Sequence, residues 1–308
     1  MVRPINKFTI PFNYFLSLKS VGVLAGGYNS SFVFVSTIDS FNFATDTHSP
    51  AIGNLSVSKG NMAGTTNKSS IFVEGGAGST NGSAVNTISE IPSATLINSV
   101  LLTTLNTARA WTFSASSSPT GFVFAGNNYS GSRSITSVEE LSFSTKTNSL
   151  SSSTVTNRNS SGPNRNMQTL SHAYLVQGEV SGNGSDSSFT KYNLSTKTSV
   201  DSGTTGSGGV TSCGSMHNTN FGYQFVPPST GRSGLKVAFA TDTWSSMSNP
   251  TTYFQSCTLF NTLAGYQMGG EPSNPTASYA KMSFATETFS YSSLSSVKDS
   301  AVGQQNFY

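Results

Sequence analysis

The sequence predicts an all-β protein, a single six-bladed β-propeller with four-stranded blades. Composition is the first observation behind this: of 308 residues, only 9% are charged and 35% are hydrophobic, while 58 are Ser and 37 are Thr. Ala, Leu, Glu and Lys, which fill exposed helix faces, are scarce. The aromatic content of 11% argues against a disordered chain. Two phrases that recur in step along the chain are the second and third observations.

The first phrase ends in Thr-x-Thr and sets the period of the repeat. A weaker copy, residues 91–95 (IPSAT), fills the gap after the first clear copy. By subtraction, successive copies start 48, 52, 51, 45 and 45 residues apart. Sequence repeats of this length are typical of propellers and solenoids. The clear copies are residues 43–47 (FATDT), 143–147 (FSTKT), 194–198 (LSTKT), 239–243 (FATDT) and 284–288 (FATET).

The second phrase is an apolar strand that ends in small residues. Residues 21–27, 71–76 and 263–270 end in a double glycine, residues 122–126 and 173–178 keep one glycine, and residues 221–225 have none at that end. Glycines there permit positive φ and close backbone approach.

Each unit therefore reads as four strands, named a to d. Strand a is exemplified by residues 166–170, and strand b is the apolar phrase. Strand c leads into the Thr-x-Thr turn, and strand d follows it. We expect a tight turn whose hydroxyls bond the local backbone. Six such units stacked in a ring bury sheet faces that one unit cannot cover alone.

These phrases resemble known repeats. The strand ending in Gly-Gly, followed by a strand and a short polar turn, resembles the kelch repeat of β-propellers. Trp244, directly after Thr243, stands where the kelch tryptophan falls. The FATDT phrases resemble more closely the kelch-like repeat proteins of tailed phages of the marine and cyanophage type. The resemblance covers residues 21–308 and implies a virion-associated role.

The two ends of the chain are predicted to close the ring. Residues 294–303 match residues 55–64, which read as the end of strand d followed by strand a of the second unit. We therefore expect residues 300–303 to pack as strand a beside residues 21–27. The alternative is that residues 14–18 supply this strand and the C-terminal tail stays outside the ring.

Residues 1–20 are predicted to form an extended arm, and residues 21–308 the propeller. Apolar side chains alternate along the arm with strand periodicity and must be buried, either on the chain's own propeller or on a neighbouring chain. The second alternative makes the arm a docking segment for other virion proteins. The apolar stretch 8–18 is too short for a membrane span and lacks the features of a signal peptide. The docking residues are Phe8, Ile10, Phe12 and Tyr14.

Charge and residue spacing predict no catalytic site, metal or cofactor. The net charge of +3 comes without a basic run, which argues against nucleic-acid binding. Glu139 and Glu140 are adjacent in a strand, so they point to opposite faces and make a poor acid–base pair. Cys213 and Cys257 are expected to be buried free thiols. The histidines lie in separate units without metal-ligand spacing: His48, His172 and His217.

The candidate binding residues lie in two loops that follow a strand b: Tyr28 with Asn29, and Asn128 with Tyr129. An aromatic ring stacks on a sugar face while an amide bonds its hydroxyls. Alternatively, these are turn-forming residues. The sequence thus predicts a non-enzymatic structural or adhesion protein of a phage virion, in the tail or fibre, with the propeller as a docking or receptor- and glycan-binding module. The alternatives are a free lectin-like propeller, a head decoration protein, and a degenerate propeller hydrolase or oxidase.

Overall fold

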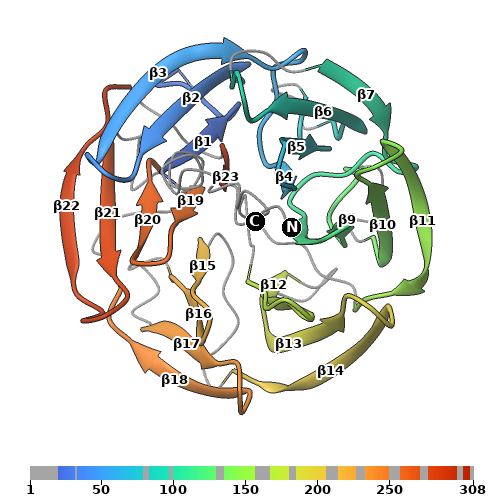
Figure 1. Cartoon of the computed structure of the whole chain (residues 1–308). Coiled ribbons are helices and arrows are strands. Elements are labelled where there is room, and N and C mark those ends of the chain that lie inside the picture. The colour runs from blue at the N-terminus through green and yellow to red at the C-terminus, as the bar shows by residue number, and fades with distance from the viewer. Residues whose placement is uncertain are drawn as a thin grey trace, which may run out of the picture.

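The computed structural model describes residues 20–31, 33–78, 83–96, 100–129, 135–156, 167–179, 185–205, 214–226, 233–249, 257–270, 277–296 and 301–305. Within these residues, five antiparallel sheets of four strands and one of three form a ring around a central axis (Figure 1). The predicted all-β, six-bladed propeller is thereby confirmed. The arm residues Phe8, Ile10, Phe12 and Tyr14 lie outside the described residues.

Each blade runs from an inner strand a to an outer strand d. In blades 1 to 3 the strands are, from a to d, β23 (Val302–Gln305), β1 (Val21–Ala25), β2 (Thr37–Asn42), β3 (Thr47–Asn54); β4 (Ala63–Thr66), β5 (Ser70–Glu74), β6 (Thr87–Pro92), β7 (Val100–Thr104); and β8 (Phe113–Ser117), β9 (Thr120–Phe124), β10 (Ser137–Ser142), β11 (Thr147–Thr154). In blade 4, strands b to d are β12 (His172–Glu179), β13 (Ser185–Asn193) and β14 (Thr198–Thr204). In blades 5 and 6 the strands from a to d are β15 (Ser215–His217), β16 (Phe221–Gln224), β17 (Gly234–Ala238), β18 (Thr243–Met247); and β19 (Cys257–Phe260), β20 (Ala264–Met268), β21 (Ser278–Ser283), β22 (Phe289–Ser293).

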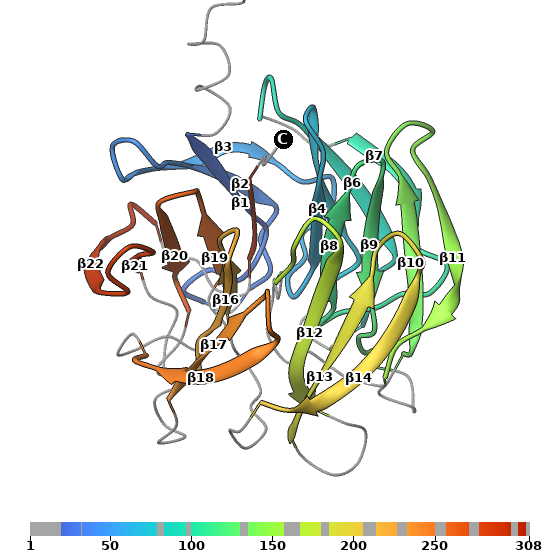
Figure 2. The same ribbon diagram turned by 60° about the horizontal axis from the view of Figure 1, so that its bottom comes forward.

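The strands of each blade run between the two faces of the ring (Figure 2). Because successive strands are antiparallel, the a–b and c–d turns share one face, here called the turn face. The b–c loops and the d–a connections share the other, the loop face.

The C-terminal strand closes the ring, as predicted. β23 pairs antiparallel with β1, from Gly22 opposite Gln305 to Ala25 opposite Val302, and lies beside it near the centre (Figure 1). The pairing begins two residues later than the expected segment 300–303. With β2 on its other edge, β1 has no edge left for residues 14–18, so that alternative is wrong.

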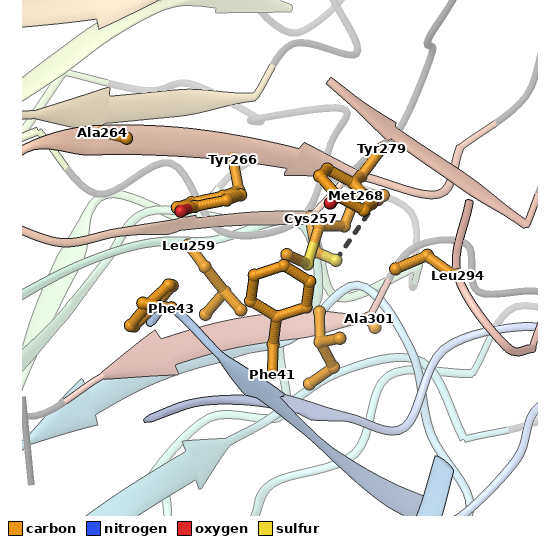
Figure 3. Packing of buried hydrophobic residues seen from close by; sticks show 11 residues of the cluster. Phe41, Phe43, Cys257, Leu259, Ala264, Tyr266, Met268, Tyr279, Leu294 and Ala301 are labelled. Carbon is orange, nitrogen blue, oxygen red and sulfur yellow. Dashed lines mark hydrogen bonds between the residues drawn. The ribbon is translucent and has the colours of Figure 1, made fainter. Parts of the chain in front are cut away.

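A buried cluster joins blade 6 to blade 1 across this closure (Figure 3). Phe41 of β2 packs against Tyr266 of β20, with ring centroids 5.0 Å apart. Cys257 is a buried free thiol, as expected, and its Sγ donates a hydrogen bond to the Met268 carbonyl at 3.3 Å. Ala301, in the C-terminal segment, is fully buried in the same cluster. Cys213 lies outside the described residues.

Blade 4 departs from the four-strand pattern. Where strand a was expected at residues 166–170, the described residues form only one bridge, between Gln168 and Ala173. The Gln168 amide accepts a hydrogen bond from Ser116 N at 2.8 Å and donates one to Ser116 O at 2.9 Å. A side chain also makes the equivalent contact between blades 3 and 2, where Ser116 Oγ accepts from Thr66 N at 2.9 Å.

The Thr-x-Thr turns differ in detail from the prediction. In all five clear copies the two threonine hydroxyls bond each other at 2.7 Å, as in Thr45 and Thr47, rather than the local backbone. The weaker copy is shifted by two residues, because Leu96 and not Ala94 occupies the left-handed turn position. Residues at this position have φ between 52° and 58°: Asp46, Leu96, Lys146, Lys197, Asp242 and Glu287.

The double glycines behave as expected. Gly26 and Gly27 have φ of 63° and 94°. A Cβ on Gly26 would lie 2.4 Å from the Lys59 carbonyl oxygen, so a larger residue would clash with the next blade.

Hydroxyl side chains also join the inner strands of neighbouring blades. Ser114 Oγ donates to the Gly64 carbonyl at 2.9 Å, and Thr258 Oγ1 donates to the Ser215 carbonyl at 2.6 Å. The high Ser and Thr content therefore serves the interior as well as the surface.

Candidate functional site

The rings of the two predicted binding loops come together on the loop face. Tyr28 follows β1 and Tyr129 follows β9, yet both pack on one buried group, Phe34, Ala77 and Ala110. Tyr28 stacks on Phe34 with ring centroids 4.2 Å apart. Three blades therefore contribute to a single cluster.

Trp111 completes this cluster, and sequence reasoning missed it as a site residue. Its ring centroid lies 5.2 Å from that of Tyr129, and Trp111 N donates to the Asn61 carbonyl at 2.9 Å. Tyr28, Trp111 and Tyr129 are all half-buried. We call Tyr28, Phe34, Trp111 and Tyr129 the aromatic platform. The available signal was that Trp111 is one of only two tryptophans in the chain.

The Tyr129 phenol of the platform is protonated at neutral pH. Burial, and secondarily the neighbouring Tyr28, raises the pKa of Tyr129 to about 12. A protonated phenol both donates and accepts hydrogen bonds. The platform therefore combines ring faces with a hydroxyl group able to bond a ligand.

The neighbouring asparagines have a structural role. Asn29 Oδ1 accepts hydrogen bonds from Ser31 N at 2.9 Å and Val33 N at 3.1 Å, which matches the turn-forming alternative. Asn127 Oδ1 accepts from Tyr129 N at 2.7 Å and so positions that ring. Asn128 is half-buried beside it. The rings, more than the amides, define the candidate site.

A second concave site lies on the turn face. A cavity of about 460 Å³, here called the turn pocket, is formed by the a–b turns of blades 4, 5 and 6. The His217 and Phe260 rings in its wall are 4.3 Å apart at 62°. Among the described residues that line it there is no Asp, Glu, Lys or Arg; these residues are Gln168, Thr169, Leu170, Ser171, His217, Asn218, Thr219, Phe260, Asn261 and Thr262.

A serine, a histidine and an aspartate meet where blade 6 joins blade 1. Ser295 Oγ lies 2.7 Å from His48 Nδ1, and His48 Nε2 lies 3.0 Å from Asp39 Oδ2. The backbone N–H of Ser295 also donates to His48 Nδ1 at 3.1 Å. Ser295 Oγ donates in turn to the His48 carbonyl at 3.1 Å.

The corresponding contact between blades 2 and 3 indicates that this arrangement fixes a backbone segment of the neighbouring blade. There Glu139 accepts directly from Asn106 N at 2.7 Å and Thr107 N at 3.0 Å. Asp39 is one methylene shorter, and His48 bridges the remaining distance. The same backbone segment is thus fixed at both junctions, with or without a histidine.

Blades 2 and 3 also bury acidic and basic side chains in their walls. Arg109 Nη2 donates to Glu139 Oε1 at 2.7 Å, with both side chains fully buried. Lys59 Nζ donates to the Val73 and Thr87 carbonyls at 3.2 and 3.1 Å. Burial lowers the pKa of Lys59 to about 7. These groups bond the backbone of their own blades, so we assign them to the framework.

Two further features were searched for in the described residues. No group of three or more His, Cys, Asp or Glu side chains there is arranged to hold a metal ion. Over the same part of the chain, no helix is long and apolar enough to cross a membrane.

Comparison with known proteins supports the fold alone. No protein-family model matches the sequence, and no curated protein matches it either. Among the 376 matching chains of solved structures is one titled "Structure of YjhT". The two share 12% sequence identity and a TM-score of 0.64, over 82% of this chain and 89% of that one. So widely shared a fold does not specify a function, which must come from the site.

Proposed function

We propose that this protein is a non-enzymatic binding module of a phage virion, in the tail or fibre, and that its aromatic platform binds a glycan of the host surface. The observation behind the proposal is the convergence of Tyr28 from blade 1 with Trp111 and Tyr129 from blade 3 into one half-exposed cluster. Aromatic rings stack on the apolar faces of sugars while hydroxyl groups bond the rim.

The virion assignment rests on the resemblance of the FATDT phrases to tailed-phage repeat proteins. In this proposal residues 1–20 contact other virion proteins and the loop face points to the host. A low content of charged residues, 9%, and a surface rich in hydroxyls suit a rigid particle component. A free lectin and a head decoration protein use the same platform in a different location.

Glycan binding is tested on the full chain with an array of bacterial surface oligosaccharides, followed by calorimetry on the strongest binder. We expect Trp111→Ala to weaken binding at least tenfold. Trp244→Phe is the matched control, because Trp244 packs on Phe189 in blade 4 and belongs to another part of the ring. Equal binding by the wild type and Trp111→Ala would remove the platform from the proposal.

The location is tested by labelling purified virions with an antibody to the propeller and viewing them by electron microscopy. Label on the tail or fibres supports the proposal. Label on the capsid favours head decoration. Protein in the lysate with no label on particles favours the free lectin.

A further inference from the structure

The turn pocket opens on the face from which the N-terminal segment leaves the ring. In blade 1 the place of the a–b turn is taken by the chain ends, since Gly22 at the start of β1 pairs with Gln305 at the end of β23. Phe260 and Asn261, on the blade 6 side of the pocket, lie at the a–b turn of the adjoining blade. The start of β1, to which the arm is joined, and the pocket therefore lie on the same face.

The pocket offers an uncharged surface with exposed apolar groups. Leu170 in its wall is 87% exposed, and Leu263, which follows Thr262, is 75% exposed. Exposed apolar groups around a concavity mark a binding surface. The volume of about 460 Å³ is in the range of ligand pockets, about 300–1,000 Å³. Such a surface fits apolar side chains better than a charged ligand.

The arm has a matching row of side chains. Phe8, Ile10 and Phe12 alternate with Thr9 and Pro11, so in an extended conformation they share one side. Phe12 is eight residues before Ser20, which allows a span of about 26 Å at roughly 3.3 Å per residue. A tethered segment within reach of its site has an effective concentration of about millimolar.

We infer that the turn pocket is the docking site for the apolar side chains at positions 8–12 of the chain's own N-terminal arm. Docking covers these side chains in the isolated protein until another virion protein takes the arm. The inference concerns a different face and different residues from the aromatic platform, so it does not depend on glycan binding.

The test uses the full chain with Ile10 replaced by the photoreactive residue p-benzoylphenylalanine. After irradiation we expect crosslinks to peptides containing residues 168–171, 217–219 or 260–262, in a product with the mass of one chain. Crosslinks to other peptides, the absence of crosslinks, or a product with the mass of two chains would overturn the inference. The last result would place the arm in a second copy.

Two variants sharpen this test. Leu170→Arg introduces a charge at an exposed position of the pocket, and we expect at least a fivefold loss of crosslink yield with an unchanged circular dichroism spectrum. Leu150→Arg is the matched control, because Leu150 is 53% exposed on β11 of blade 3. Equal yields from the two variants would contradict pocket docking. Trp111→Ala should leave the crosslink yield unchanged, which separates this inference from the proposed glycan site.

Discussion

Blades 1–3 bury charged side chains in their walls, whereas the described parts of blades 4–6 bury only uncharged polar groups at the equivalent depth. The position of Glu139 on strand c is taken by Leu235 in blade 5 and Ala280 in blade 6, judged by their pairing with strand b. The blade fold therefore does not require these charges. The buried acidic and basic residues are Asp39, Lys59, Glu74, Glu90, Arg109, Glu139 and Glu140.

The ion pairs between neighbouring blades also differ between the two halves of the ring. In blade 6, Lys281 of strand c binds Asp46 in the turn of blade 1 at 2.6 Å. Tyr266, opposite Lys281 on strand b, donates its hydroxyl to Asp46 Oδ1 at 2.7 Å. In blade 3 the charges are reversed: Glu140 binds Lys197 at 2.6 Å, and the residue opposite Glu140 is Phe122.

The residue on strand b, the residue opposite it on strand c and the turn residue of the next blade thus differ from blade to blade as one set. A hydroxyl on strand b donates to an acidic residue in the next turn, whereas a lysine there offers no acceptor and can only donate to the hydroxyl oxygen. Where turn and strand c are both uncharged, as with Leu96 and Ser40, strand b has Val23. The charged sets are Tyr174, Lys191 and Asp242; Tyr223, Lys236 and Glu287; Tyr266, Lys281 and Asp46; Phe72, Glu90 and Lys146; and Phe122, Glu140 and Lys197.

The largest effect is expected where blade 3 buries its ion pair. Arg109→Leu leaves Glu139 charged and buried without its cation, at a cost of about 3–5 kcal/mol in the free energy of unfolding. Urea denaturation measures it. The double variant Arg109→Leu with Glu139→Leu, which imitates Leu235 of blade 5, should be more stable than the sum of the two single effects predicts. A cost below about 1 kcal/mol for Arg109→Leu would show that the two halves are held equally without charge.

Glu74 provides a pH-dependent test of the charged half. Burial raises the pKa of Glu74 to about 8, a shift that hydrogen bonding from Thr65 and attraction to Lys59 oppose. The folded state therefore keeps the proton more strongly than the unfolded state, and this group's contribution to stability decreases as pH rises from about 4.5 to about 8.

Glu74→Gln should remove that decrease and raise the free energy of unfolding at pH 7 by about 1–3 kcal/mol. Urea denaturation at pH 5 and pH 7 measures both values. Met268 occupies the equivalent position in blade 6, so Met268→Leu is the control and should add no such pH dependence. If Glu74→Gln showed the same difference in the free energy of unfolding between pH 5 and pH 7 as the wild type, Glu74 would be excluded as the source of that difference.

The pairing of a strand-b tyrosine with an acidic turn is tested by removing one hydroxyl in blade 6 and adding one in blade 3. Tyr266→Phe removes the hydrogen bond to Asp46, and Phe122→Tyr adds a hydroxyl where the next turn has Lys197. We expect each to cost about 1–2 kcal/mol in the free energy of unfolding, because Tyr266→Phe leaves Asp46 without this donor and Phe122→Tyr buries a hydroxyl for which the next turn supplies no acceptor. Thermal unfolding compares the two variants with the wild type. If Phe122→Tyr instead stabilised the protein, the pairing of strand-b tyrosines with acidic turns would be contradicted.

The smallest effect is expected for the ion pairs themselves, which are partly exposed. Lys146→Glu against Glu90 should cost about 0.5–1 kcal/mol, and adding Glu90→Lys should restore most of it. High salt should reduce the effect of the single change. Urea denaturation at low and high salt measures both. If the single and double variants lost the same free energy of unfolding, the loss would come from the changed turn residue and not from the charge.

Much of the fold was predictable because it depends on short-range patterns. The spacing of the Thr-x-Thr phrases gives six units, and the match of the C-terminal tail to a strand a gives the closure beside Val21. The displaced register at Leu96 was not predictable from a match of residue types, because the left-handed position is defined by φ. Tyr28 and Tyr129 were identified as candidates, whereas Trp111 was not, since only packing brings it beside them.

By itself, the sequence determined the local units: apolar strands, positive-φ turns and double glycines, each a matter of sterics among near neighbours. Tertiary structure decided which units touch. Tyr266 meets Asp46 from 220 residues away, and Ser295 meets His48 from 247 residues away, only because ring closure brings blade 6 against blade 1. It also decided that the Gln168 side chain of blade 4 bonds the Ser116 backbone of blade 3. Contacts between blades depend on the stacking angle and register of whole sheets, which no short stretch of sequence contains.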